Sequence, residues 1–196
     1  MGYPVLAWYT LVMKKAILVH GWGGHPEIYW FPWLKKELEA SGYEVAVPQM
    51  PNPDFPNQSE WVKEIASAVG APSKDLYFIT HSLGSVATLR YIETLSENES
   101  IGGVVMVCGF TEPIGYKEPD QFLETPVNYE KIKHVARKMV AINSDNDPYV
   151  SMRHAEVLRD KLGAELIVMR NAGHINKDSG FLQLPEAVEA LLKISA

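Results

Sequence analysis

The sequence predicts an α/β fold: an open, mostly parallel sheet of about six strands with helices on both faces. Short apolar runs recur along the whole chain and alternate with stretches of helical spacing. The runs are near-continuous, which is typical of strands buried on both faces of a parallel sheet. Alternation of strand and helix implies crossover connections between parallel strands. The strands are expected at 16–19, 44–47, 76–79, 103–107, 139–142 and 166–169.

Helical spacing fills the gaps between these strands. Apolar residues between Trp61 and Val69 form one stripe, with Ser59 expected as its N-cap and Gly70 as its end. Further helices are expected at about 155–162 and 184–192. These amphipathic stretches supply the helices that the crossover connections require.

Two proline-rich segments interrupt this pattern. The segment "PQMPNPDFPNQ" covers residues 48–58 and holds four prolines, and "GFTEPIGYKEPDQFLETP" covers 109–126 and holds three. Proline lacks the backbone donor that helices and central strands use, so both segments are expected to be loops.

The composition favours one domain. With 196 residues, 46% of them hydrophobic, the chain can build one well-buried core and is short for two. We expect a single domain over residues 13–196. A formal net charge of −6, with no run of lysines or arginines, argues against a nucleic-acid partner. Cys108 is the only cysteine, which excludes an internal disulfide and fits a reducing compartment, the cytoplasm.

Residues 1–12 are expected to be an N-terminal extension. The opening "MGYPVLAWYTLVMKK" is apolar, but it lacks a basic region before the apolar stretch, and that stretch is too short to span a bilayer. The stretch that begins at Met13, "MKKAILVHGWGG", is more typical of a protein N-terminus. An upstream start or a surface-packed extension is therefore favoured, with a membrane anchor as the alternative.

A serine, an acid and a histidine follow three different predicted strands. Ser82 comes after the third strand, Asp145 and Asp147 come after the fifth, and His174 comes after the sixth. The carboxyl ends of parallel strands meet at one edge of the sheet, where ligands gather. The chain order of serine, acid and histidine is the order found in α/β-hydrolases.

These residue types suit nucleophilic catalysis. Ser82 needs a base to take its proton during attack, and His174 can supply one, because imidazole titrates near neutrality. An aspartate would orient the imidazole and stabilise the cation that forms. The backbone N–H groups of Leu83, at a helix start, and of Trp22, in a glycine-rich turn, are expected to form an oxyanion hole.

The identity of the acid stays open between two residues. Asp147 precedes Pro148 and sits just before a helix, whereas Asp145 lies deeper in the turn, where it could serve by capping it. We favour Asp147, with Asp145 as the alternative.

The stretch "LYFITHSLGS" departs from the usual pattern around such a serine. That pattern is G-x-S-x-G, and Thr80 occupies the position of the first glycine. The simplest alternative is that Ser82 only caps the helix that follows. We expect a working nucleophile elbow, in which Ser82 has a positive φ and a slightly wider gap between the strand and the helix accommodates the Thr80 side chain.

Three aromatic residues, together with the two proline-rich segments, are expected to line an apolar pocket. The aromatic residues are Trp22, Phe110 and Tyr149, and packing in the core or in loops is the alternative for each. No spacing in the chain resembles a metal site, so neither a metal nor a cofactor is expected. Cys108 is interpreted as a buried structural thiol.

The chain resembles the α/β-hydrolases, and among them the small serine hydrolases of the retinoblastoma-binding protein nine and YdeN-like group. The resemblance runs from Lys15 to the C-terminus and rests on "AILVHGWGG", "PQMPNPDFP", "HSLG", "DNDPYV" and "AGHIN". It implies a compact fold without a large lid and a triad of Ser82, Asp147 and His174. The group's link to the retinoblastoma protein depends on an L-x-C-x-E motif, which "MVCGF" does not form, so that partner is not implied and a protein partner stays unknown.

Hydrolysis of an acyl bond is the expected function. The favoured substrate is a small-molecule carboxylic ester with a modest acyl group, cleaved through an acyl-enzyme on Ser82. One alternative is a non-catalytic interaction module on a hydrolase scaffold, and another is a peptidase or lyase that uses the same triad. Fold by itself does not separate these alternatives.

Overall fold

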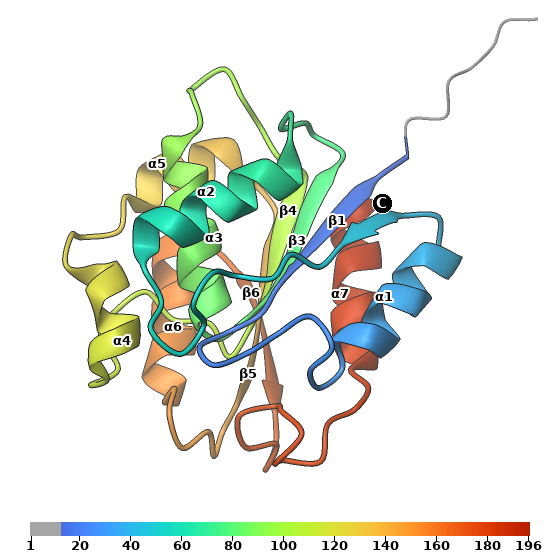
Figure 1. Ribbon diagram of the computed structural model, residues 1–196. Coiled ribbons are helices and arrows are strands. Elements are labelled where there is room, and N and C mark those ends of the chain that lie inside the picture. The colour runs from blue at the N-terminus through green and yellow to red at the C-terminus, as the bar shows by residue number, and fades with distance from the viewer. Residues whose placement is uncertain (1–12) are drawn as a thin grey trace, which may run out of the picture.

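A six-stranded parallel sheet forms the centre of the molecule. The computed structural model describes residues 13–196 (Figure 1). The strand order is β2-β1-β3-β4-β5-β6, and every neighbouring pair is parallel. The strands are β1 (Lys15–Val19), β2 (Glu44–Ala46), β3 (Leu76–His81), β4 (Gly103–Val107), β5 (Met139–Ser144) and β6 (Glu165–Met169). The predicted fold class is confirmed, and the extension expected at 1–12 lies outside the described residues.

Helices cover both faces of the sheet. They are α1 (Phe31–Ala40), α2 (Gln58–Val69), α3 (Leu83–Thr94), α4 (Lys117–Asp120), α5 (Tyr129–Val135), α6 (Met152–Leu162) and α7 (Pro185–Ser195). Helices α1 and α7 pack on one face, and α2, α3, α5 and α6 pack on the other (Figure 1). Successive strand residues point to opposite faces, so Phe78 joins one core cluster and Ile79 the other.

The two edge strands differ from the expectation of burial on both faces. Strands β1, β3, β4 and β5 are buried along almost their whole length, whereas β2 and β6 contain exposed and half-buried residues. Val168 of β6, for example, is 46% exposed. The reason is positional, because an edge strand has a neighbour on one side only.

The start of α2 also differs from the prediction. Asn57, and not Ser59, is the N-cap: its side chain accepts a hydrogen bond from the Glu60 backbone N–H at 3.2 Å. The Ser59 hydroxyl donates to the same Asn57 oxygen at 2.7 Å. The expected end is confirmed, since Gly70 follows the helix with a φ of +70°.

The second proline-rich segment is not entirely a loop. It contains the short helix α4 and a 3-10 turn at Gln121–Leu123. Pro119 is tolerated within α4 because the first turn of a helix has no partner for its N–H groups. The expectation of a loop throughout residues 109–126 is therefore wrong.

A buried arginine ties this segment to α3. Arg90 donates hydrogen bonds to the carbonyls of Phe122, Thr125 and Pro126, and its guanidinium pairs with Glu93 at 2.8 Å. The arginine side chain is only 5% exposed. The helix that begins next to Ser82 thus holds the segment that follows β4.

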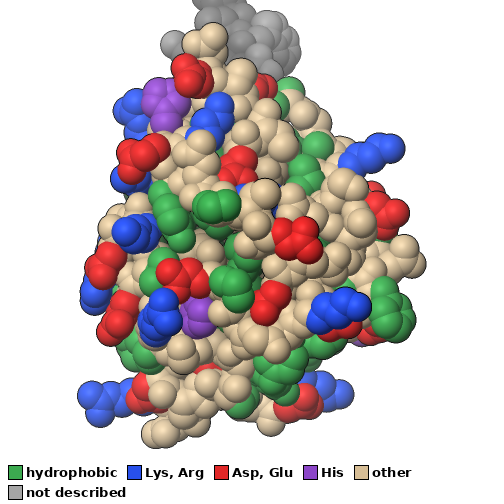
Figure 2. All heavy atoms as spheres, turned by 90° about the vertical axis from the view of Figure 1, so that its left-hand side faces the viewer, with side chains coloured by type: hydrophobic (Ala, Val, Ile, Leu, Met, Phe, Trp, Pro, Cys, Tyr) green, Lys and Arg blue, Asp and Glu red, His purple; other side chains and the backbone are tan. Residues whose placement is uncertain are grey.

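The distribution of charge on the surface and the length of the helices bear on what the molecule could bind. On the face that carries α4, acidic and basic side chains are interspersed around a group of apolar side chains (Figure 2). No helix among residues 13–196 has the length and apolar character needed to cross a bilayer.

Candidate active site

Ser82 occupies a strained turn between β3 and α3. Its φ is +52° and its ψ is −122°, which confirms the expected positive φ. Its side chain makes no capping hydrogen bond to α3, so the alternative of a simple helix cap is wrong. Gly84 permits this turn: a Cβ there would lie 2.4 Å from the Val19 carbonyl oxygen and 2.6 Å from that of His20. The start of α3 therefore packs directly against the end of β1.

Thr80 fits into this turn through its hydroxyl group. The residue is fully buried, and its Oγ1 lies 2.8 Å from the Ser85 Oγ and 3.4 Å from the Val105 carbonyl oxygen. Ser85 is on the first turn of α3, so the two hydroxyls join the strand to the helix. A threonine thus takes the place of a glycine without leaving its buried polar atom unpaired.

Asp147, and not Asp145, lies against His174. The His174 Nδ1–H donates to Asp147 Oδ2 at 2.8 Å. The other carboxylate oxygen accepts from the backbone N–H groups of Tyr149 and Val150 at 2.9 and 3.0 Å. Asp145 instead accepts from the Asn171 backbone N–H at 2.8 Å, so its carboxylate organises the loop that carries His174.

The surroundings of Asp147 keep it ionised. Its side chain is fully buried, and burial alone would raise its pKa. The hydrogen bond and charge of His174, together with the two backbone donors, outweigh burial and hold the Asp147 pKa below its ordinary value. A charged acid beside the imidazole is what stabilisation of an imidazolium requires.

Ser82 and His174 line the same cavity. No hydrogen bond links the two side chains within residues 13–196, although both belong to the wall of this cavity. The structure thus gathers Ser82, His174 and Asp147 at one edge of the sheet.

The glycine-rich turn after β1 lies close to Ser82. A Cβ on Gly21 would be 3.0 Å from the Ser82 Cβ. Within the part of the chain that the structure describes, the backbone N–H groups of Trp22 and Leu83 donate to no other residue. Both predicted donors are therefore free to bind a negatively charged oxygen.

The first proline-rich loop holds this turn in place. The His20 Nδ1–H donates to the Gly21 carbonyl at 2.9 Å, and its Nε2 accepts from the Met50 backbone N–H at 3.1 Å. The Gly23 N–H donates to the Pro53 carbonyl at 2.9 Å. Burial lowers the pKa of His20, which favours the neutral ring that can donate and accept at once.

The cavity beside Ser82 is small and mostly apolar. Its volume is about 230 Å³. The apolar part of its wall is formed by Trp22, Tyr29, Ile114, Tyr116, Pro119 and Tyr149, and the polar part includes Asn176 and Asp178. The rings of Trp22, Tyr116 and Tyr149 follow one another with centroids 6.1 and 6.0 Å apart. These three aromatic side chains form a continuous rim.

Phe110 does not line this cavity. It is fully buried and packs in the core cluster on the α3 side of the sheet. The pocket role expected for Phe110 is therefore wrong, because the chain after β4 turns its side chain into the core. Tyr149 and Trp22 do line the cavity. Tyr29, Asn176 and Asp178 were missed, since no motif marks loop residues that converge only in the folded chain.

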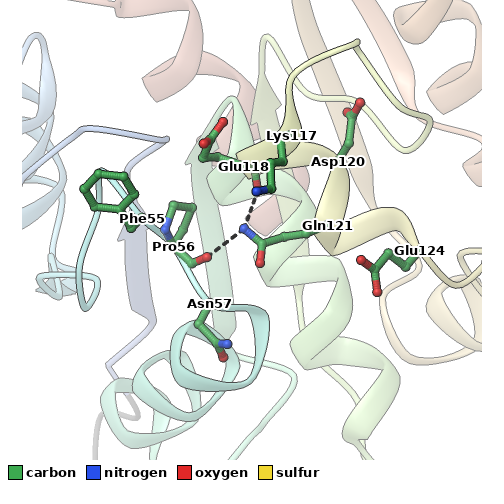
Figure 3. Close-up of a pocket in the computed structure, with 8 residues that line it drawn as sticks. All are labelled: Phe55, Pro56, Asn57, Lys117, Glu118, Asp120, Gln121 and Glu124. Carbon is green, nitrogen blue, oxygen red and sulfur yellow. Dashed lines mark hydrogen bonds between the residues drawn. The ribbon is translucent and has the colours of Figure 1, made fainter.

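A larger hollow of about 640 Å³ lies between the loop at Phe55 and α4 (Figure 3). Gln121 bridges its two sides: its Nε2 donates to the carbonyls of Pro56 and Glu118 at 2.8 and 2.9 Å. None of the residues predicted to act in chemistry lines this hollow. The candidate active site is the smaller cavity.

One cluster near the site has ligand atoms of the kind that metals bind. The candidate atoms of His81, Cys108 and His174 lie within 4.8 Å of one another. His81 Nε2 donates to the His174 carbonyl at 2.9 Å, however, and His174 Nδ1 is taken by Asp147. Burial raises the pKa of the Cys108 thiol, which keeps it protonated. We interpret the cluster as packing around His174.

Comparisons with known proteins agree with the motifs. The family described as serine hydrolase matches residues 16–193. The chain is 30% identical over 179 residues to the putative hydrolase YdeN of Bacillus subtilis (strain 168), which covers 91% of this chain and 94% of that protein. It is 26% identical over 183 residues to the serine hydrolase RBBP9 of Rattus norvegicus, and the match covers 91% of this chain and 95% of that protein. The crystal structure of the ydeN gene product from B. subtilis has a TM-score of 0.88 at 30% identity, covering 92% of this chain and 98% of that one. The resemblance inferred from the motifs is confirmed.

Proposed function

Because the chain belongs to the serine hydrolase family, we propose that it cleaves carboxylic esters with a modest acyl group through an acyl-enzyme on Ser82. The observation that carries the proposal is the Asp147–His174 hydrogen bond of 2.8 Å beside a cavity that Ser82 also lines. In the proposed scheme, one edge of the sheet supplies the nucleophile, the base and the orienting acid.

The proposed reaction has two halves. The Ser82 Oγ attacks the ester carbonyl carbon while His174 Nε2 takes its proton, and the oxyanion is bound by the N–H groups of Trp22 and Leu83. The C–O bond to the alcohol then breaks, and His174 returns the proton to the leaving oxygen. A water molecule repeats the attack on the acyl-enzyme and releases the acid. Asp147 keeps the Nδ1–H of His174 in place throughout.

Cavity size and lining support a short acyl group. A volume of about 230 Å³ lies below the range of roughly 300–1,000 Å³ that is usual for drug-sized ligands. The wall is mainly aromatic and apolar, which suits a hydrocarbon chain. A longer chain would have to extend past the rim formed by Trp22, Tyr116 and Tyr149. We also propose a cytoplasmic location, which the single, buried, unpaired cysteine supports.

A fluorophosphonate probe followed by a series of nitrophenyl esters tests the proposal. We expect one modification site, mapped by peptide mass spectrometry to Ser82. We expect kcat/KM to be highest for acetyl to butyryl esters and to fall about tenfold or more for dodecanoyl, a difference of about 1.4 kcal/mol. Labelling without ester turnover would favour the peptidase or lyase alternatives. Absence of labelling would favour the non-catalytic module.

Substitutions of Thr80 test the elbow. Thr80→Gly should keep kcat/KM for a short ester within a few-fold of the wild type, because glycine is the residue usual at this position. Thr80→Leu should lower it about tenfold or more, because the larger side chain overpacks a buried site and displaces Ser85 beside the nucleophile. Thr80→Ser, which keeps the hydroxyl, is the matched control. Wild-type turnover by the leucine variant would show that the elbow tolerates bulk.

A further inference from the structure

Two buried ring N–H groups hold the backbone that carries His174. The Nε2–H of His81 donates to the carbonyl of His174, and the Nε1–H of Trp30 donates to the carbonyl of Ile175, both at 2.9 Å. Trp30 is fully buried and His81 is 3% exposed. Consecutive carbonyls therefore receive donors from two distant segments, one before α1 and one at the end of β3.

The loop needs such restraint because its backbone is strained. Ile175 has a φ of +47°, a conformation that is an outlier for a β-branched residue. A strained residue persists only when its surroundings over-determine it. The Trp30 hydrogen bond falls on the carbonyl of this same residue.

The backbone N–H groups of the same loop are held by side-chain acceptors. The backbone N–H groups of Ala172, Gly173 and His174 donate to side-chain oxygens of Ser144, Asn146 and Ser179, at 3.0, 2.8 and 3.2 Å respectively. With donors on its carbonyls and acceptors on its N–H groups, the backbone around His174 has little freedom.

The two rings also support each other. Trp30 and His81 meet edge to face with centroids 5.9 Å apart, and Trp30 stacks on Phe31 at 4.3 Å. Tyr29 contacts the His81 ring at 5.7 Å. Aromatic packing of this kind fixes the direction in which each ring N–H points.

A donor at this place must be neutral. The His81 and His174 ring centroids are only 4.7 Å apart, so a positive His81 would repel the imidazolium that forms on His174 during the proposed reaction. Burial, followed by the proximity of His174, lowers the pKa of His81 to about 3. His81 thus stays neutral in the range in which a serine hydrolase works, and its proton sits on Nε2, the nitrogen that donates.

We propose that His81 and Trp30 are positioning residues, which set the place of the His174 ring by holding the carbonyls of His174 and Ile175. The proposal rests on the proposed function, because the ring that they place is the proposed general base. Neither residue touches the substrate in this scheme. Their effect reaches the reaction only through His174.

The test compares variants that remove or keep each donor. His81→Phe and Trp30→Phe lose the ring N–H and keep an aromatic side chain, whereas His81→Gln keeps a neutral N–H donor. Trp33→Phe, in the half-buried part of α1, is the matched control for loss of an indole. For each variant we would measure kcat and KM on a short ester, the melting temperature, and hydrogen exchange of the amides at 171–176.

We expect His81→Phe and Trp30→Phe to lower kcat about 10-fold to 100-fold with little change in KM, as misplacement of a reacting group by about 1 Å does. Amides 171–176 should exchange faster in both variants. His81→Gln should recover most of kcat and of the protection, and Trp33→Phe should behave like the wild type.

The outcomes separate this proposal from the proposed function. Wild-type kcat and wild-type exchange in His81→Phe and Trp30→Phe would overturn the positioning role. So would faster exchange spread over the whole chain, or a His81→Gln variant as impaired as His81→Phe. A wild type that neither labels nor hydrolyses esters would instead end the proposed function, while the exchange at 171–176 would still show whether the two rings hold the loop.

Discussion

Ser82→Ala should abolish fluorophosphonate labelling and lower kcat for short esters by roughly 10⁶, the loss seen when the serine of a well-studied triad is removed. The fold should be unchanged. The Ser82 side chain does not cap α3, so its hydroxyl contributes no hydrogen bond to the helix that it precedes. Alanine also keeps the Cβ that packs against Gly21. Circular dichroism and the melting temperature would check this.

Ser151→Ala is the matched control for this substitution. Ser151 is an exposed serine that precedes α6 and, like Ser82, makes no capping hydrogen bond through its side chain. Its loss should leave labelling and kcat unchanged. Equal labelling of the wild type and Ser82→Ala would exclude Ser82 as the nucleophile, whatever the ester turnover.

Asp147→Asn should lower kcat by roughly 10⁴, as the equivalent change does in the best-studied triad. An asparagine amide can donate to His174 Nδ1, which leaves the ring proton on Nε2, the nitrogen that must accept from Ser82. The carbonyl oxygen of the new amide would still accept from the backbone of Tyr149 and Val150, so the turn should persist. The effect should therefore appear in kcat and not in the melting temperature.

Asp145→Asn provides the comparison two residues away. Its amide oxygen can still accept from the Asn171 backbone N–H, which is the only hydrogen bond of the Asp145 side chain within residues 13–196. We expect kcat within a few-fold of the wild type. If Asp145→Asn lost more activity than Asp147→Asn in the same assay, the acid of the proposed triad would be Asp145.

The fold could be predicted because its signals are local. Each strand of the sheet is a short apolar run, and its length, together with the helical spacing of the stretches between the runs, separates it from the amphipathic helices. One error in the local structure arose where two neighbouring residues compete. Both Asn57 and Ser59 can cap a helix, and the backbone before α2 decided for Asn57. Pro119 was expected to lie in a loop. It lies in the first turn of α4, where proline is tolerated, and the sequence does not show where that turn begins.

For the candidate site, the residue types and their order along the chain could be predicted without the structure. Ser82, an aspartate and His174 each follow a strand, and parallel strands bring their carboxyl ends to one edge whatever the loops do. The roles of Gly84 and of the glycine-rich turn at Trp22 could also be predicted, because close approach of two backbone segments requires glycine.

Which of the neighbouring side chains meet depends on contacts that exist only in the folded chain. Asp147 faces His174 and Asp145 faces Asn171 because hydrogen bonds between loops more than 20 residues apart select the rotation of the turn after β5. For a similar reason the Phe110 side chain lies in the core and the Tyr149 side chain lines the cavity. Contacts with other loops place each of these two loops. Residues near in sequence share the same local signals, and what distinguishes them is the partner that folding brings to each.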